Sequence, residues 1–254
     1  MKLFKSIATT LVVSILTTLL YGLSAGTNFS TYKVSAADSV QSFSDVPKTH
    51  TNAAAITDLK ARGVVSGYTD GTFKPDQAVN RAEALKIILL ASKIDIPDAY
   101  TGSGFIDIAP DAWFARYVAK AKTWGIIEGY PDRTFRGYQT VNLVEALKIL
   151  IITNNIDLGR IIVFEDPYRD AYKNQWYSKY IAYAKEKALI DADFRNMIYP
   201  AQFLTRAKLA EIMYRFTLKL ESAKADTLGA TSAASASTTK TTTATTSTTG
   251  TSSS

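Results

Sequence analysis

The sequence predicts a mainly α-helical protein built from three tandem helix-loop-helix units. A pattern of roughly 60 residues recurs three times, as in repeat architectures that expose a binding surface. One ten-residue segment recurs in register within each copy, and its apolar residues follow three- and four-residue steps typical of an amphipathic helix. The segments are NRAEALKIIL at 80–89, NLVEALKILI at 142–151 and TRAKLAEIMY at 205–214. Their apolar stripes imply one shared core.

The first 36 residues have the layout of a secretory signal peptide. Lys2 and Lys5 precede an apolar run at 7–23, and Val34-Ser35-Ala36 offers small residues suited to cleavage after Ala36. An uncleaved membrane anchor is the alternative, although a run of about 17 residues broken by Ser and Thr is short for a membrane span. Either interpretation places the rest of the chain outside the cytoplasm.

An F-x-D triplet marks the start of each unit. Phe43, Phe105 and Phe164 open the three triplets, at intervals of 62 and 59 residues. We therefore place the units at 37–103, 104–162 and 163–221.

The first helix of each unit is placed by pairs of apolar residues three apart. These pairs are Ile56 and Leu59, Val118 and Ala121, and Ile181 and Ala184. Gly63 and Gly125 follow the first two helices, as left-handed C-terminal residues commonly do. Ala188 holds the same place in the third unit, so we expect that helix to end less cleanly.

The second helix of each unit carries its own start signal. Asn80 and Asn142 are each followed three residues later by an acid, Glu83 and Glu145, which is the pattern of a capping box. In the third unit Thr205 is the expected cap, with Lys208 in place of the acid. Because capping accounts for the Asn and Glu residues, we assign them a structural role.

Arg81 and Arg206 break a rule at the same place in two units. A cation at the first helical position is unfavourable by a few tenths of a kcal/mol, because the helix start is already positive. A guanidinium beside free helix-start amides could grip a carboxylate or phosphate. The alternative is an arginine held as a strut by a neighbouring acid. Leu143 occupies the place in the second unit, so we expect a pocket centred there to bind anions poorly or not at all.

The last residues, 222–254, are predicted to be a disordered tail. From Asp226 onward they are almost wholly Thr, Ser, Ala and Gly, with too few large apolar residues to offset chain entropy by burial. A solvated spacer and an O-glycosylated stalk both fit this composition.

Charge and composition exclude several functions. Three of the 29 basic residues precede the proposed cleavage site, so the mature chain has 26 basic and 23 acidic residues. This small excess of positive charge does not indicate nucleic-acid binding. The chain has no cysteine and one histidine, His50, which excludes thiolate chemistry and argues against a triad or a histidine metal cluster. A glycosidase carboxylate pair is disfavoured because the acids recur at equivalent turns. A calcium role for Asp70 and Asp76 lacks sufficient oxygen ligands.

The chain resembles the S-layer homology domain in its triple form, over about residues 43–220 of this sequence. The residues that carry the resemblance are FSDV, FIDI and FEDP, the pairs Trp113-Phe114 and Trp176-Tyr177, the loop GYTDGTFKP from Gly67, and the T-R-A-E-like helix starts. The resemblance implies a pseudo-threefold prism around a central three-helix bundle, with ligand grooves between units. It also implies noncovalent attachment to the cell surface through a secondary cell-wall polysaccharide bearing a pyruvate ketal.

The resemblance and the residues together give the expected ligand contacts. They are Arg81, Arg206, Asp45, Asp107, Asp166, Trp113, Trp176, Gly67, Tyr68, Gly129 and Tyr130. The alternatives are that the Trp residues are core and the Asp residues form caps or turns. No unit matches the family pattern completely, so we expect at most two competent grooves, no cofactor or metal, and no catalytic residue. The rival function is a structural role through contacts with other S-layer or envelope proteins, without glycan recognition.

Overall fold

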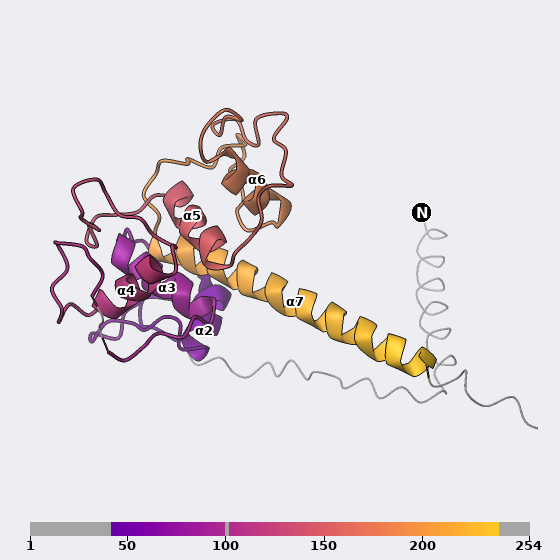
Figure 1. Cartoon of the computed structure of the whole chain (residues 1–254), viewed down its shortest axis with the longest axis horizontal. Helices are drawn as coiled ribbons and strands as arrows, with labels where there is room; N and C mark the ends of the chain where they lie inside the picture. Colours follow the sequence, from indigo (N-terminus) through magenta and orange to yellow (C-terminus); the bar gives the residue numbers. More distant parts are fainter. Residues whose placement is uncertain (1–41, 100–101, 239–254) are drawn as a thin grey trace, which may run out of the picture. The chain divides into compact units, whose positions relative to one another are not determined.

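The computed structural model describes residues 42–99 and 102–238. Those residues form six α-helices and no β-strand (Figure 1), which confirms the mainly α prediction. The helices are α2 (Ala53–Ala61), α3 (Arg81–Ala91), α4 (Ala115–Thr123), α5 (Leu143–Thr153), α6 (Ser178–Glu186) and α7 (Arg206–Thr238). The proposed signal segment 1–36 and the last tail residues, 239–254, lie outside the described residues.

The second helix of each unit contributes most to the core. Helix α3 packs against both α5 and α7, while the shorter α2, α4 and α6 pack against α7, α3 and α5 respectively (Figure 1). The predicted apolar stripes are buried, including Leu85 and Ile88 on α3 and Leu147 and Leu150 on α5. Each first helix therefore covers the second helix of the preceding unit in the cyclic order.

A ring of backbone hydrogen bonds ties the three units together just before their second helices. The Val79 N–H donates to the Leu204 carbonyl (2.9 Å), Leu204 N–H to Val141 (2.9 Å), and Val141 N–H to Val79 (3.1 Å). Each unit thus donates to one neighbour and accepts from the other, so no backbone group in the ring is left unpaired. Such cyclic order is what a pseudo-threefold arrangement requires. The prism outline implied by the family resemblance stays a prediction.

The start of the third unit was predicted wrongly. Phe164 is 80% exposed, whereas Tyr168 is 6% exposed, close to Phe43 and Phe105 at 5% and 8%. The third unit therefore opens with Tyr168-Arg169-Asp170. Tyrosine replaces phenylalanine there, so a search for F-x-D selects the exposed Phe164 instead.

The acid that follows each opening aromatic residue fastens the loop of its unit. Asp45 accepts from the Phe73 and Lys74 N–H groups, both at 2.7 Å, and Asp107 accepts from Phe135 and Arg136 at 2.8 and 2.7 Å. In the third unit Asp170 does the same for Ile198 and Tyr199, at 3.0 and 2.7 Å. The two amides lie 28 and 29 residues after the acid in every unit, which fixes the equivalence.

The first helices end at the predicted positions. Gly63 and Gly125 have φ values of 70° and 68°, in the left-handed region. Ala188 adopts the same conformation with φ 52°. A residue with a Cβ is less stable in this conformation by about 1–2 kcal/mol, a penalty that glycine does not have. The third helix therefore ends in the same geometry as the other two, but less favourably.

The tail prediction is wrong for residues 222–238, because α7 continues to Thr238. Composition indicated too little apolar surface to bury, but a helix that is already nucleated gains one hydrogen bond for each residue added and needs no burial of its own. The Ala, Glu and Lys residues just after Leu220 favour this extension. Arg62 at the end of α2 also pairs with Glu221, which holds α7 against α2 at that point.

Candidate functional site

Three pockets lie between the units and repeat the same plan. Each is lined by the loop and second helix of one unit, by the first helical residue of the preceding unit's second helix, and by the Trp-position residue of the following unit. We name them after the first helical residue: the Arg206 pocket (about 360 Å³), the Arg81 pocket (about 210 Å³) and the Leu143 pocket (about 350 Å³). The pockets follow the cyclic order of the backbone ring.

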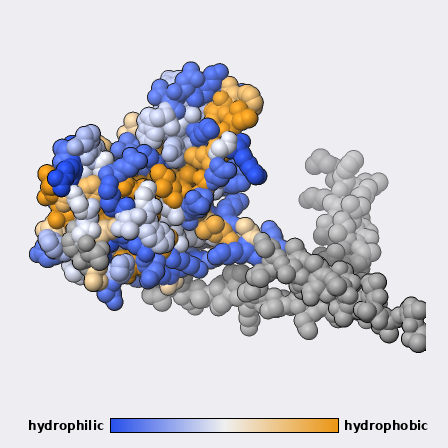
Figure 2. Space-filling view, in the orientation of Figure 1, coloured by the Kyte–Doolittle hydropathy of each residue, from blue (hydrophilic) through white to orange (hydrophobic). Residues whose placement is uncertain are grey.

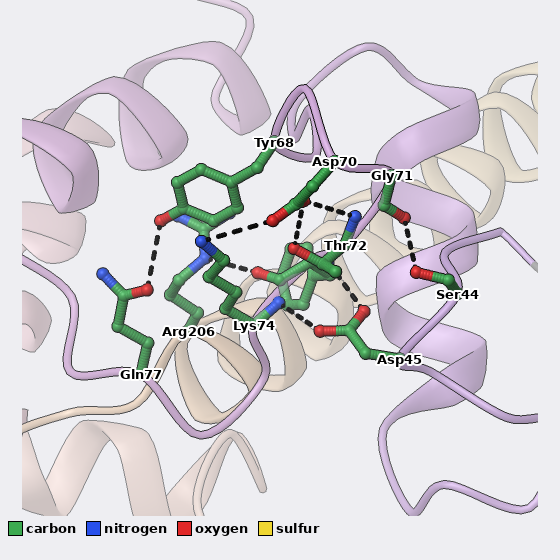
Figure 3. A network of polar contacts seen from close by, with 10 residues as sticks. Ser44, Asp45, Tyr68, Asp70, Gly71, Thr72, Lys74, Gln77 and Arg206 are labelled. Carbon is green, nitrogen blue, oxygen red and sulfur yellow. Dashed lines mark hydrogen bonds and ion pairs between the residues drawn. The ribbon is translucent and has the colours of Figure 1, made fainter.

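Arg206 is fixed in the wall of its pocket by aromatic rings. It is 6% exposed, and its Nε donates to the Phe73 carbonyl at 2.8 Å. Its Cζ lies 4.7 Å from the centre of the Phe73 ring and 5.1 Å from that of Tyr68, beside which Figure 3 shows it. Glu83 is its ion-pair partner among the described residues, at a loose 3.8 Å. The guanidinium is therefore held mainly by stacking and a carbonyl, not by a tight carboxylate pair.

Arg81 repeats this arrangement in the second pocket. Its Nε donates to the Phe135 carbonyl at 3.2 Å, and its Cζ lies 5.2 Å from the Phe135 ring centre and 5.5 Å from that of Tyr130. Within the described part of the chain, no carboxylate lies within ion-pair distance of Arg81. Its side chain is half-buried. The strut alternative, an arginine held by a neighbouring acid, is thus weak for Arg206 and unsupported for Arg81.

A lysine and a tryptophan accompany each arginine. Trp113 lines the Arg206 pocket and Trp176 lines the Arg81 pocket, and they are 46% and 58% exposed. Lys86 places its Nζ 5.6 Å from the Trp113 ring centre, and Lys148 does the same at 5.8 Å from Trp176. The exposure favours a role as platforms over the core alternative. Each of the two pockets thus combines two cations with an exposed indole face.

The helix-start amides are not available to an anion, contrary to the sequence-based expectation. The Arg81 and Ala82 N–H groups donate to the Gln139 and Gly137 carbonyls, and Glu83 N–H donates to the Asn80 side chain. At α7 the Arg206 and Ala207 N–H groups donate to Gln77 and Pro75. The neighbouring loop consumes these donors as it docks against the helix. An anion would therefore be held by side-chain cations rather than by backbone amides.

The Leu143 pocket has a different lining. Leu143 stands at the arginine position and Thr51 at the tryptophan position, and Leu204 and Ile198 reach the pocket wall. Its charged side chains come from different helical positions, notably Lys208 and Arg215. It therefore lacks the stacked guanidinium of the other two pockets.

The sequence matches the family model of the S-layer homology domain in three segments. These are residues 42–85, 104–142 and 167–210, which together make up half of the 254-residue chain. The chain belongs to the S-layer homology family. The third segment begins one residue before Tyr168, in agreement with the corrected start of the third unit. The three predicted S-layer homology repeats are thus confirmed.

Several relatives are named as surface or anchoring proteins, and this chain covers less than a third of the length of each of the following three. It is 29% identical over 148 residues to Cell surface glycoprotein 1 of Acetivibrio thermocellus, covering 55% of this chain and 6% of that protein. The Cellulosome-anchoring protein of the same organism is 30% identical over 145 residues, 55% of this chain and 31% of the relative. The Surface layer protein of Brevibacillus choshinensis is 28% identical over 123 residues, 48% of this chain and 10% of the relative. S-layer homology repeats in such relatives indicate an exported protein of the cell wall or surface.

Three predicted contact residues lie away from the pockets of this S-layer homology protein. The Asp45 and Asp107 carboxylates each accept two backbone N–H groups of a loop, and Asp166 accepts from the Lys173 N–H at 2.8 Å. None of them lines any of the three pockets. Their geometry is that of turn and loop anchors, the alternative considered from the sequence, and we leave them out of the proposed site.

Gly67 and Gly129 line the pockets, but their missing side chains make room for the protein itself. A Cβ on Gly67 would lie 2.4 Å from the Phe43 ring, and one on Gly129 would lie 2.1 Å from the Phe105 ring. Tyr68 and Tyr130, the residues that follow, provide the rings against which Arg206 and Arg81 stack. The glycines therefore let the loop close over the opening phenylalanine, and that closure positions the tyrosines.

Sequence reasoning missed Lys86 and Lys148. Each lies three residues after the capping glutamate of its helix and lines one of the two arginine pockets. Their recurrence at the seventh position of two aligned segments was the available signal.

Metal binding and membrane spanning find no support in the described residues. No group of three or more His, Cys, Asp or Glu side chains is arranged there to hold a metal ion. Asp70, which the sequence analysis disfavoured as a calcium ligand, accepts from the Thr72 N–H and hydroxyl at 3.0 and 2.6 Å. No helix among those residues is long and apolar enough to cross a membrane.

Proposed function

We propose that the chain anchors a protein noncovalently to the cell surface by binding an acidic secondary cell-wall polysaccharide in the Arg206 and Arg81 pockets. The observation that carries the proposal is that Arg206 and Arg81 lie over aromatic rings in the same way. In each arginine the Nε donates to a backbone carbonyl. The terminal nitrogens have one loose carboxylate partner in Arg206 and none in Arg81 among the described residues. A guanidinium fixed before binding loses little side-chain entropy when it pairs with a carboxylate. The family resemblance and the anchoring relatives support the same function.

A pyruvate ketal on the polymer fits these pockets chemically. Its carboxylate is an anion at neutral pH and suits a guanidinium with a second cation, Lys86 or Lys148, nearby. The apolar face of the sugar ring suits the exposed faces of Trp113 and Trp176. Two pockets that engage one polymer raise the apparent affinity beyond that of either pocket. Cosedimentation with isolated walls, before and after mild acid removal of ketals, tests the ligand: binding that survives ketal removal contradicts this assignment.

The tryptophan platform yields a matched pair of variants in one unit. We expect Trp113→Ala to weaken binding to the wall polymer about twofold to tenfold, because an aromatic contact contributes about 0.5–1.5 kcal/mol. Trp124→Ala is the control, since Trp124 is 55% exposed but lines none of the three pockets. Isothermal titration with purified polymer measures both. Equal weakening by the two variants would show that Trp113 is not a platform.

The two arginine pockets differ in one charge at their rims. Glu128 lines the Arg81 pocket where Ser66 lines the Arg206 pocket, and both residues are exposed. A surface carboxylate repels an anionic ligand by up to about 1 kcal/mol, less at high salt. We therefore expect the Arg206 pocket to bind more tightly.

Exchange of the two rim residues tests this ranking. Glu128→Ser in an Arg206→Gln background should strengthen binding about threefold at low salt, and Ser66→Glu in an Arg81→Gln background should weaken it similarly. The difference should shrink in high salt because the charges are exposed. Titration of each variant with the same polymer at two salt concentrations measures it. An unchanged affinity in both backgrounds removes Glu128 and Ser66 as determinants.

The rival function is a structural role through protein contacts alone. A pull-down of envelope proteins that is indifferent to wall polymer would favour it over the glycan proposal. We also propose that the chain has no catalytic activity of its own, since its relatives include surface and anchoring proteins, and the amylopullulanase and the exoglucanase among them match it over only 10% and 14% of their own lengths. Release of new reducing ends from wall glycans would overturn that.

A further inference from the structure

Tyr138 gives the Arg206 pocket a second exposed aromatic ring beside Trp113. Its side chain is 72% exposed and lines that pocket. The equivalent residues of the other units, four positions before the cap of the second helix, are Asp76 and Ala201. Neither of them lines any of the three pockets. The additional ring is therefore a feature of this pocket and not of the repeat.

The backbone on both sides of Tyr138 is fixed against helix α3. The Gly137 carbonyl accepts from the Ala82 N–H at 3.0 Å, and the Gln139 carbonyl accepts from the Arg81 N–H at 2.9 Å. The same helix provides one wall of the Arg206 pocket. Docking of the second unit on α3 thus places Tyr138 at this wall before any ligand binds.

Tyr138 and Trp113 both rest on the buried ring of Phe114. The Tyr138 ring centre lies 5.4 Å from that of Phe114 at an interplanar angle of 86°, and the Trp113 ring centre lies 5.2 Å from it at 81°. Phe114 is 2% exposed, so it is a fixed support. No ring contact joins Trp113 to Tyr138 among the described residues, and their centres are at most about twice 5.4 Å apart. The pocket therefore presents two separate aromatic surfaces to one ligand.

The Arg81 pocket has the same support but no second ring. Trp176 rests on Tyr177 at 5.6 Å and 80°, the arrangement found in the second unit. Ala201, at the place of Tyr138, offers only a methyl group. The Arg81 pocket is also smaller, about 210 Å³ against about 360 Å³. The two pockets thus differ in how much of a polymer they can cover, apart from the charge at their rims.

The location of Tyr138 distinguishes it from an ordinary surface tyrosine. Hydrophobic residues reach the face of the protein shown in Figure 2 in patches between hydrophilic ones, and a single exposed aromatic residue needs no explanation. Tyr138, however, shares both a buried support and a pocket with Trp113. An aromatic ring can pack against the apolar face of a sugar, and the tyrosine hydroxyl can bond to the sugar hydroxyls.

We propose that the Arg206 pocket binds two consecutive sugar residues of the polymer, one on Trp113 and its neighbour on Tyr138, whereas the Arg81 pocket binds one. This inference rests on the proposed function, because it takes the acidic wall polysaccharide as the ligand. The sugar with the acidic group lies at Trp113, where the Lys86 Nζ is 5.6 Å from the ring centre. The neighbouring sugar on Tyr138 needs no charge. Tyr138 thus determines the length of glycan that this pocket recognises.

The test uses fragments of the purified wall polymer that contain one or two sugar residues and retain the acidic group. In the full chain with Arg81→Gln, which leaves the Arg206 pocket intact, the two-sugar fragment should bind about twofold to tenfold more tightly than the one-sugar fragment. Tyr138→Ala should abolish this gain, while Tyr138→Phe should keep it because the ring is retained. Isothermal titration measures each affinity.

The Arg81 pocket allows the converse experiment. In the full chain with Arg206→Gln, the two fragments should bind equally, and Ala201→Tyr should create a preference for the longer one. Tyr172→Ala is the control for both backgrounds, since Tyr172 is 54% exposed but lines none of the pockets.

Two kinds of failure are distinguishable. A preference for the two-sugar fragment that survives Tyr138→Ala, or that is already present in the Arg206→Gln chain, overturns this proposal and leaves wall anchoring intact. Loss of the preference in Tyr138→Phe overturns it as well, because the ring would then not be the contact. Absence of binding by both fragments and by the whole polymer overturns the proposed function, and this inference with it.

Discussion

The double variant Arg81→Gln, Arg206→Gln should lose cosedimentation with isolated cell walls. A hydrogen bond to a charged group contributes about 1.5–3 kcal/mol, so each single variant should weaken polymer binding about tenfold or more. The double variant removes both stacked guanidinium groups and should weaken binding about a hundredfold or more, because the two pockets then no longer reinforce one another. Glutamine keeps a donor for the Phe73 and Phe135 carbonyls while it removes the charge.

The controls separate loss of binding from loss of fold. Arg206 is buried and donates to the Phe73 carbonyl at 2.8 Å, so its replacement also costs some stability. Thermal unfolding of every variant must therefore accompany the sedimentation. Arg116→Gln is the matched control, since Arg116 pairs at 3.5 Å with the fully exposed Asp98 and lines none of the pockets. A folded double variant that sediments like the unchanged protein would end the proposal that these arginines hold the polymer.

The repeat made most of the fold predictable from the sequence. Helix starts are local signals, and the capping boxes at Asn80 and Asn142 form as expected. The arginine positions were also visible, because a cation at a helix start is locally unfavourable and its recurrence needs a reason. These features depend on residues within one turn of each other.

Features that depend on docking between units could not be predicted in the same way. The amides of Arg81 and Ala82 look free in the sequence, but the carbonyls that occupy them, Gln139 and Gly137, lie more than 50 residues away in the chain. The position of Trp113 shows the same limit, because the pocket that it lines is built largely from residues of other units, such as Lys86 and Arg206. Sequence reasoning identified the arginines and aromatics that meet in the pockets, but not how their backbone is satisfied.

The third unit offers the sharpest test of the corrected register. Asp170→Ala should destabilise the protein by about 2–4 kcal/mol, because the amides of the buried Ile198 and the half-buried Tyr199 lose their common acceptor. Asp166→Ala should cost less than about 1 kcal/mol, since Asp166 is exposed and accepts from one exposed amide. Urea unfolding of the two variants measures the difference. Asp45→Ala is the reference and should match Asp170→Ala.

The same pair of variants links stability to the Leu143 pocket. Ile198 and Tyr199, which Asp170 fastens, both line that pocket. Loss of the Asp170 carboxylate should therefore loosen this wall of the pocket and speed up amide hydrogen exchange at Ile198 and Tyr199, even below the temperature at which the variant unfolds. Asp166→Ala should leave hydrogen exchange at both amides unchanged. If Asp166→Ala proves the more destabilising, the third unit begins at Phe164 after all, and the equivalence of Ile198 with Phe73 and Phe135 is lost with it.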